Sequence, residues 1–126
     1  MPAVSNKPKY LNLFKIRLPL PGVVSILHRI SGFGLFVLMG LILWVFQLSL
    51  HSRAGFEFVI SLMTFWIAKL LVIGIVWAFV HHFFAGIRFL LLDLHWGADI
   101  FSARVSGVLV MAVSIASTLF FALIIW

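Results

Sequence analysis

The sequence predicts an all-α membrane protein built from three transmembrane helices. Of its 126 residues, 64% are hydrophobic and only 10% are charged, and the mean hydropathy is +1.25. A soluble domain of this size carries about 25% charged residues. Three apolar segments are each long enough to cross the roughly 30 Å hydrocarbon layer, which takes about 20 helical residues. The length fits a single domain. Because three helices alone make a thin bundle, we expect a partner subunit that adds helices.

The three expected spans are separated by short connections. The first runs over about 23–50 and is entered through the motif LPLPG, whose prolines suit a turn or a first helical position. The second runs over about 58–92, which is long enough to tilt or to project beyond the bilayer. The third covers about 103–126. The stretch HSRAGFE, residues 51–57, is expected to be a solvated loop between the first two spans.

Lysine and arginine set the expected orientation. One side of the membrane receives the N-terminal tail and the connection 93–102, whereas the loop on the other side carries Arg53 alone. Because cytoplasmic loops carry an excess of basic residues, we expect a cytoplasmic N-terminus and an external C-terminus. The first twenty residues are basic and lack an apolar core, so we expect no cleaved signal peptide. The cations assigned to the cytoplasmic side are Lys7, Lys9, Lys15, Arg17, Arg88 and Arg104.

The composition excludes several classes of function. The chain has no cysteine, which excludes disulfides, thiolate-bound iron–sulfur clusters, c-type haem and thiol catalysis within it. The net charge of +6 lies at the ends of the spans and accompanies no basic face or recognition motif, so we expect no nucleic-acid binding. No carboxylate pair, nucleophile constellation or phosphate loop supports hydrolytic chemistry.

Two histidines stand in the apolar stretch FVHHFFAGIRFLLLDL, residues 79–94. His81 and His82 lie in a helix roughly 15 Å from its cytoplasmic end. Either one could simply form a hydrogen bond across helices. His82 and Gly86 are four residues apart and share one face, where a glycine leaves room for a flat macrocycle beside a ligating histidine. His81 shares its face with Arg88, so the residues alone favour His82 only modestly as a ligand.

A second polar cluster, SILHRISG at residues 25–32, lies near the cytoplasmic end of the first span. Ser25, His28, Arg29 and Gly32 follow spacings of three and four residues along one stripe. Arg29 could snorkel to the lipid headgroups, but the shared stripe suits a pocket better. Antiparallel first and second helices would bring the two clusters to similar depth. Arginine and histidine could then meet carboxylates, such as haem propionates, because the arginine fork pairs with both oxygens.

Together the two clusters resemble a known family. SILHRISG at the start of the first span, and HxxxGIR followed by LLLD at the end of the second, are similar to the cytochrome b-type large membrane-anchor subunits of succinate dehydrogenase, respiratory complex II. The resemblance covers essentially the whole chain. It implies half of a haem-binding bundle: two small anchor subunits hold one haem b and tether an iron–sulfur subunit and a flavoprotein subunit. Electrons from succinate then reach ubiquinone where the anchors meet the iron–sulfur subunit.

The resemblance also implies roles for individual residues. His82 matches the axial ligand of the haem iron, and the opposite axial histidine would come from the partner anchor. Ser25 and Arg29 match residues of the quinone site, while His28 and Arg29 match positions near the haem propionates. Arg88 matches the family arginine of GIR and is a further cofactor-binding candidate. The chain would then be a non-flavin subunit of the enzyme, with no complete active site of its own.

The sequence departs from the family pattern at one position. The family often continues GIRH, whereas this chain has Phe89 there. A second histidine near the haem is therefore absent, which puts in doubt a role of this position in haem or proton chemistry. The axial role of His82 is not affected.

Two alternative functions remain from the sequence. The closer one is a quinol:fumarate reductase anchor, which uses the same machinery in reverse. The other is a small haem-free transport or assembly protein in which Lys69, His81 and Arg88 line a proton or ion path, and purification without a chromophore would favour it. We expect a bacterial inner (plasma) membrane, because no Arg- and Ser-rich transit segment is present. A mitochondrial inner membrane is the alternative if the chain is a processed form.

Overall fold

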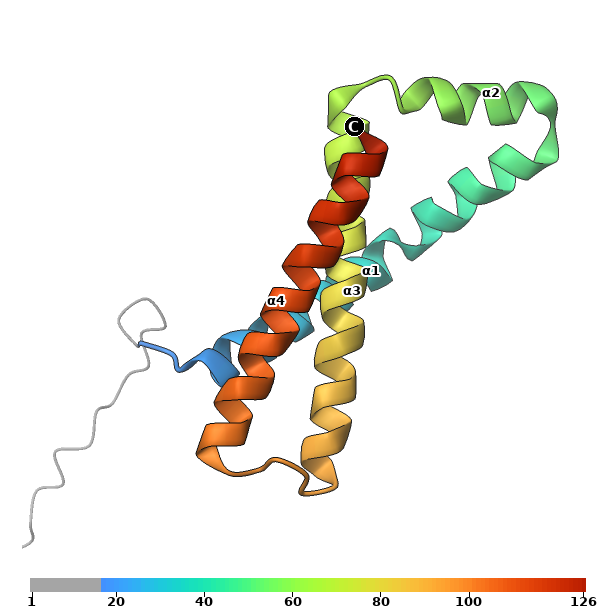
Figure 1. Ribbon diagram of the computed structural model, residues 1–126. Helices are drawn as coiled ribbons and strands as arrows, with labels where there is room; N and C mark the ends of the chain where they lie inside the picture. The colour runs from blue at the N-terminus through green and yellow to red at the C-terminus, as the bar shows by residue number, and fades with distance from the viewer. Residues whose placement is uncertain (1–16) are drawn as a thin grey trace, which may run out of the picture.

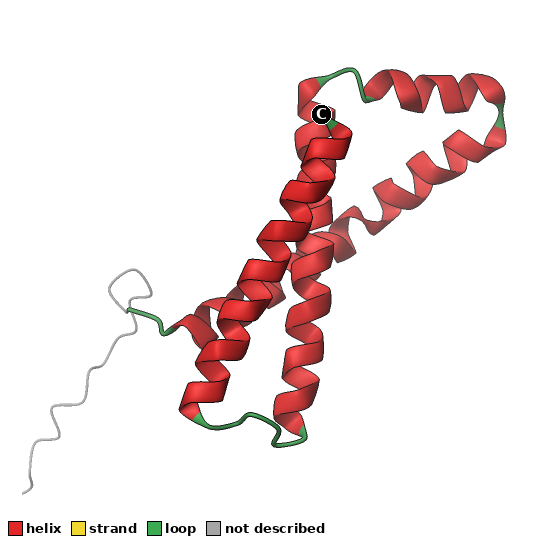
Figure 2. Cartoon of the chain, viewed as in Figure 1, coloured by secondary structure: helices red, strands yellow, loops and turns green. Residues whose placement is uncertain are grey.

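The computed structural model describes residues 17–126, which form four helices and no strand (Figures 1 and 2). These are α1 (Leu20–His51), α2 (Arg53–Leu62), α3 (Trp66–Asp93) and α4 (Ile100–Ile125). α1, α3 and α4 are each long and apolar enough to cross a membrane. The predicted all-α membrane architecture is therefore confirmed. The predicted cytoplasmic cations Lys7, Lys9 and Lys15 lie outside the described residues.

The bounds of the first and third spans agree with expectation to within three residues. α1 covers 20–51 where 23–50 was expected, and α4 covers 100–125 where 103–126 was expected. A proline occupies one of the first two positions of α1, as the LPLPG motif predicted, because a proline there loses no intrahelical hydrogen bond.

The expected second span of 58–92 is wrong at its start. A tight turn at residues 63–65 ends α2, and α3 begins only at Trp66. The backbone amide of Phe65 donates to the carbonyl of Leu62 at 3.1 Å, and the Thr64 hydroxyl donates to the Ser61 carbonyl at 2.7 Å. Phe65 then takes an extended conformation. The break falls among apolar residues, so hydropathy alone did not reveal it.

The expected loop 51–57 is also wrong, because it forms the first turns of α2. Ser52 is extended and accepts a hydrogen bond from the Gly55 amide at 3.0 Å, which makes it an N-cap. A side chain at position 55 would collide with the carbonyl of Leu48, so only glycine allows α1 and α2 to meet so tightly. Arg53 and Glu57 form an exposed ion pair at 3.0 Å. α2 is thus a short arm that leaves α1 at a sharp corner.

The long helices form two different pairs. α3 and α4 run side by side in opposite directions, whereas α1 crosses them and diverges towards α2 (Figure 1). The start of α1 lies at the same end as the α3–α4 connection, and α2 lies at the other end with Trp126 (Figure 1). This arrangement agrees with the expected distribution of chain ends. Which end faces the cytoplasm stays a prediction.

The α3–α4 connection is defined by its backbone. His95 and Gly97 adopt left-handed conformations with φ of 64° and 70°. Asp99 then caps α4, accepting a hydrogen bond from the Ser102 amide at 2.9 Å. Bonds from the Ser102 side chain and backbone amide lower the pKa of the Asp99 carboxyl. Asp99 is therefore the N-cap of α4.

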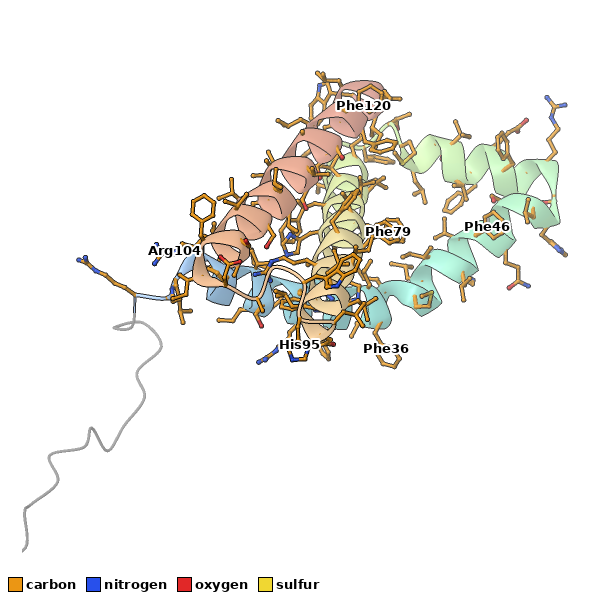
Figure 3. The ribbon with its side chains drawn as sticks, turned by 60° about the horizontal axis from the view of Figure 1, so that its bottom comes forward. Phe36, Phe46, Phe79, His95, Arg104 and Phe120 are labelled. Carbon is orange, nitrogen blue, oxygen red and sulfur yellow. The ribbon has the colours of Figure 1, made fainter. Side chains whose placement is uncertain are left out.

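The core of the bundle is small. Val24, Ala85 and Val110 are buried where α1, α3 and α4 meet. In contrast, Phe36 is 79% exposed and projects away from the helices (Figure 3). Large apolar side chains on the outside suit lipid or further helices, since a soluble monomer rarely exposes so much apolar surface.

Candidate functional site

The two polar clusters predicted from the sequence meet between α1 and α3. The imidazole of His28 stacks on that of His82, with ring centroids 4.2 Å apart and planes only 5° from parallel. The expectation that antiparallel helices bring the clusters to similar depth is confirmed. The stack is the geometric centre of the candidate site.

The hydrogen bonds of His82 determine which of its ring nitrogens carries the proton. Nδ1 lies 3.1 Å from the backbone carbonyl oxygen of His28 and 3.4 Å from the Ser31 hydroxyl. The Ser31 hydroxyl itself donates to the same carbonyl at 3.0 Å. Because a carbonyl only accepts, Nδ1 must be the donor. Nε2 therefore keeps its lone pair, and no hydrogen bond reaches it from any residue in 17–126.

Gly32 makes room for the His82 ring. A Cβ at position 32 would lie 2.7 Å from Cε1 and 3.1 Å from Nδ1 of His82. Those distances are well below the roughly 3.5–4.0 Å of a favourable carbon contact. Gly32 therefore permits the close approach of α1 to His82. Sequence reasoning noted this glycine only as the end of a stripe, although its spacing of four residues from His28 is a signal for a shared face.

Gly86 serves a different purpose from the one expected. A Cβ at position 86 would be in ordinary contact, at 3.6 Å, with Nε2 of His28. The imidazole of His28, and not open space for a macrocycle, lies beside this glycine. Gly86 therefore lies in contact distance of the second ring of the stack, which an alanine at this position would also allow.

A cavity of about 760 Å³ opens beside His82. This volume is within the roughly 300–1,000 Å³ of small-molecule and cofactor sites. His82 is the one ionisable residue among the residues that line it. The other lining residues are apolar, and they include Gly32, Leu35, Phe36, Met39, Phe79 and Phe83. The arrangement offers one nitrogen ligand in an apolar setting, which suits a flat apolar group.

Beyond the stack, His28 contacts Phe89, and Phe89 in turn contacts Arg88. The His28 and Phe89 rings lie 5.2 Å apart at 56°, and the guanidinium carbon of Arg88 lies 5.2 Å from the Phe89 centroid. The aromatic residue that departs from the family pattern thus fills the space between a histidine and a cation.

Arg88 ties α3 to α4. Its side chain is buried, with Nε donating to the Ser106 hydroxyl at 3.0 Å and Nη2 donating to the Ala103 carbonyl at 3.1 Å. Arg88 does not line the cavity beside His82. The structure therefore separates this predicted cofactor-binding residue from the other candidates.

His81 lies on another face of α3 and is fully buried. Its ring stacks on Trp77 at 5.2 Å, and its Nδ1 is 3.4 Å from the Ser114 hydroxyl of α4. That hydroxyl already donates to the Val110 carbonyl at 2.6 Å, so it accepts from His81. His81 is enclosed by packed helices, whereas His82 opens onto a cavity. The geometry favours His82 over His81 as a ligand to an added group.

Ser25 and Arg29 face outward from α1. Ser25 is half-buried and Arg29 is exposed. Neither side chain has a hydrogen-bond partner in the part of the chain that the structure describes. Both are therefore accessible to a ligand or a partner subunit at the end of α1 that also carries Arg17.

Lys69, whose role the sequence left open, contacts Trp126. Its Nζ donates to the Trp126 carbonyl at 3.2 Å and lies 5.3 Å from the ring centroid. This contact fastens the first turn of α3 to the last residue of the sequence. It does not join Lys69 to His81 or Arg88, so the residues proposed for an ion path are not connected by side-chain contacts.

Comparison with known proteins agrees with the sequence motifs. The profile of a family described as succinate dehydrogenase/fumarate reductase transmembrane subunit matches residues 3–121. The chain is 34% identical over 124 residues to the succinate dehydrogenase cytochrome b556 subunit of Coxiella burnetii, covering 97% of this chain and 98% of that protein. It is 31% identical over 110 residues to the protein of the same name from Paracoccus denitrificans, with 87% and 85% covered. For Rickettsia felis the identity is 27% over 115 residues, with 91% and 90% covered.

Proposed function

Because the chain belongs to the family of transmembrane subunits of succinate dehydrogenase and fumarate reductase, we propose that it is a cytochrome b anchor of a succinate:quinone oxidoreductase. In this proposal it binds haem b together with a partner anchor, contributes to a ubiquinone site and tethers the iron–sulfur and flavoprotein subunits. One observation carries the haem role. His82 donates through Nδ1 to a backbone carbonyl and lines a cofactor-sized cavity with its other ring nitrogen unpaired among residues 17–126.

The residues present fit a haem. The cavity is apolar, and Gly32 removes the side chain that would displace the histidine ring. A haem brings four nitrogen ligands of its own, so one histidine from this chain and one from a partner complete the coordination. Many metal-ligating histidines donate their other ring N–H to a backbone carbonyl, as His82 does. The bound haem would supply one-electron transfer or storage.

The chain's contribution to such a site is positional. The hydrogen bond from Nδ1 to the His28 carbonyl fixes the rotation and tautomer of the His82 ring, and it makes Nε2 a better electron donor. The Ser31 hydroxyl supports the same carbonyl and the same ring nitrogen. Stacking against His28 holds the ring from its flat side. These contacts restrict His82 to one orientation before any ligand is present.

Ser25 and Arg29 are proposed to bind ubiquinone. They are four residues apart on α1 and therefore share a face. A hydroxyl and a cationic guanidinium can each donate to a quinone carbonyl and stabilise the negative charge that develops on reduction. His28 and Arg29 lie at the same end of α1 and are proposed to pair with haem propionates. Arg88 is better suited to hold α4 in place, because two of its nitrogens already bond to that helix.

We place the protein in a bacterial inner membrane as a multi-pass subunit. Its relatives are bacterial, and α1, α3 and α4 are long and apolar enough to span. The end that carries Arg17 and Arg104 is proposed to face the cytoplasm, where the soluble subunits would dock. The exposed apolar faces would pack against the partner anchor and lipid.

The test of the haem proposal is a pair of histidine substitutions. The purified complex is examined as a dithionite-reduced minus oxidised difference spectrum for wild type, His82→Ala and His81→Ala. A b-type signal that is lost or strongly shifted in His82→Ala and kept in His81→Ala supports the proposal. An unchanged spectrum in His82→Ala moves the ligand elsewhere. Co-purification of the other subunits with each variant controls for failed assembly.

A further inference from the structure

A second cavity lies between α3 and α4, close to their connection. Its volume is about 260 Å³. Most of its lining is apolar and comes from the lower halves of the two helices (Figure 1). The residues that matter here are Arg88, Phe84, Ile87, Leu91, Ser106 and Leu109. His82 does not line it, so it is separate from the candidate haem site.

The guanidinium of Arg88 is an incompletely paired cation beside this cavity. The residue is 5% exposed, and its Nη1 is buried without a hydrogen-bond partner in residues 17–126. The groups that its other nitrogens reach, the Ser106 hydroxyl and the Ala103 carbonyl, are both neutral. Among the described residues, the one ion pair joins Arg53 to Glu57 at the other end of the molecule. Arg88 therefore lacks a counter-ion within that part of the chain.

The depth of Arg88 indicates what could supply the missing anion. Arg88 precedes the last residue of α3 by five positions, which is about 7 Å along the helix. With the end of α3 placed at the membrane surface, Arg88 lies near the headgroup level. A buried charge at such a place is costly unless it is paired. Basic pockets between transmembrane helices on the cytoplasmic side suit the headgroups of acidic lipids.

The apolar part of the cavity fits the remainder of a lipid. Ile87, Leu91 and Leu109 line the cavity and are 41%, 39% and 58% exposed. Trp96, which also lines it, lies in the α3–α4 connection, where an amphipathic ring suits the membrane interface. A cation at headgroup depth, an aromatic ring at the interface and an open apolar wall are the features of a phospholipid site.

We propose that the α3–α4 cavity binds an anionic phospholipid. Its phosphate pairs with the Arg88 guanidinium where that group lines the cavity, and an acyl chain lies along the wall formed by Ile87, Leu91 and Leu109. The lipid then supplies the negative charge that Arg88 lacks among the described residues, and it fills the groove between α3 and α4. This site does not depend on haem or quinone binding.

The test uses the purified protein, with the subunits that co-purify, after delipidation in detergent. Phosphatidylglycerol, phosphatidylcholine or inorganic phosphate is added, and bound lipid is counted by native mass spectrometry alongside the unfolding temperature. We expect phosphatidylglycerol to bind about tenfold more tightly than phosphatidylcholine, because both lipids carry a phosphate but the choline cation of phosphatidylcholine offsets its negative charge. Equal binding of the two lipids would overturn the proposal. Stabilisation by inorganic phosphate as large as that by phosphatidylglycerol would show a free-anion site and would overturn the lipid assignment.

Two matched variants locate the site. Leu109→Trp fills the apolar wall without touching the hydrogen bonds of Arg88, whereas Leu119→Trp is an exposed change on α4 outside the cavity. We expect Leu109→Trp to weaken phosphatidylglycerol binding about tenfold and Leu119→Trp to leave it unchanged. Arg88→Gln should abolish the preference for phosphatidylglycerol over phosphatidylcholine, a ratio that does not depend on overall stability. Wild-type binding in Leu109→Trp, or a retained preference in Arg88→Gln, would contradict the assignment.

Discussion

His81 and His82 are adjacent in sequence and have opposite surroundings. His81 is fully enclosed by α1, α3 and α4, with Trp77 against its ring and Ser114 at its Nδ1. His82 is half-buried, stacks on His28 and lines a cavity of about 760 Å³. One step along a helix rotates a side chain by about 100°. That rotation separates a histidine that holds the bundle together from one that is free to hold a ligand.

The same contrast extends to the neighbours of each histidine. On the α4 side, His81 and Arg88 each reach a serine hydroxyl, and those serines are eight residues apart on α4. Serine is small enough to let two helices approach closely while still offering an oxygen. On the α1 side, His82 donates to the His28 carbonyl, stacks on the His28 ring and fits beside the missing side chain at Gly32. Side chains of α3 thus hydrogen-bond to both neighbouring helices, but the histidine that faces α1 also lines a cavity, whereas the histidine that faces α4 is enclosed.

The largest expected effect on stability comes from His81, the enclosed histidine that faces α4. His81→Ala removes a fully buried ring and leaves a cavity among three helices, so we expect the free energy of unfolding to fall by about 2–4 kcal/mol. His82→Ala removes a half-buried ring beside an existing cavity and should cost less in the absence of a ligand. Thermal unfolding of the two variants in one detergent, after removal of haem, gives the comparison. A larger loss in His82→Ala would show that the structural role belongs to the other histidine.

The next effect, on haem retention, concerns the space that Gly32 leaves for the His82 ring. Gly32→Ala places a Cβ 2.7 Å from Cε1 of His82, so the ring or α1 must move. We expect haem retention to fall at least about tenfold, which corresponds to roughly 1.4 kcal/mol of lost binding. Gly34→Ala is the matched control, because a Cβ there meets no atom within 4 Å. Haem content per mole of assembled complex is the measurement, and equal content in the two variants would contradict the role assigned to Gly32.

A third effect tests whether Arg29 of α1 binds the quinone. Arg29→Ala should lower quinone reductase activity by about 10²-fold, a typical cost of removing one donor to a developing negative charge. Succinate oxidation with an artificial acceptor that bypasses the anchor should stay largely intact. Arg17→Ala removes an exposed cation from the same end of the molecule and controls for a general loss of positive charge. Parallel loss of both activities in Arg29→Ala would instead indicate faulty assembly.

Much of the architecture was predictable from the sequence because it depends on length and apolar content. The three spans, the antiparallel meeting of the two motifs and the proline at the start of α1 all follow from local rules. The turn before Trp66 was not predictable, because it lies among apolar residues that continue the hydropathy signal. The expected loop 51–57 and the expected start of the second span at 58 together form α2, which depends on the N-cap at Ser52 and on the close approach of Gly55 to the Leu48 carbonyl in the preceding helix.

The candidate site also has features that the sequence predicted and features that it did not. The similar depth of the two clusters followed from antiparallel packing, but the stacking of His28 on His82 was not predicted. The position of Arg88 away from that site could not be predicted from the sequence. It depends on hydrogen bonds to Ser106 and Ala103 in α4, and no spacing rule relates those residues to α3. The roles of Ser31 and Gly32 were also missed. Their signal was present in the three- and four-residue spacing from His28, but only a contact with a ring from another helix gives that spacing a meaning.

The last comparison, which includes the smallest expected effect, is between two serines, one on each side of α3. Ser31 shares the Nδ1 proton of His82 with the His28 carbonyl, so Ser31→Ala leaves that proton one good acceptor. Ser114 is the one side chain in residues 17–126 that pairs with Nδ1 of His81, so Ser114→Ala removes the side-chain partner of a buried ring nitrogen. We expect the first variant to cost about 0.5 kcal/mol and the second about 1–3 kcal/mol of unfolding free energy. In the haem spectrum the order of the two effects should reverse, with a small band shift in Ser31→Ala and none in Ser114→Ala. Thermal unfolding and the difference spectrum are measured on the same samples. A spectral shift confined to Ser114→Ala would assign the haem ligand to His81 and not to His82.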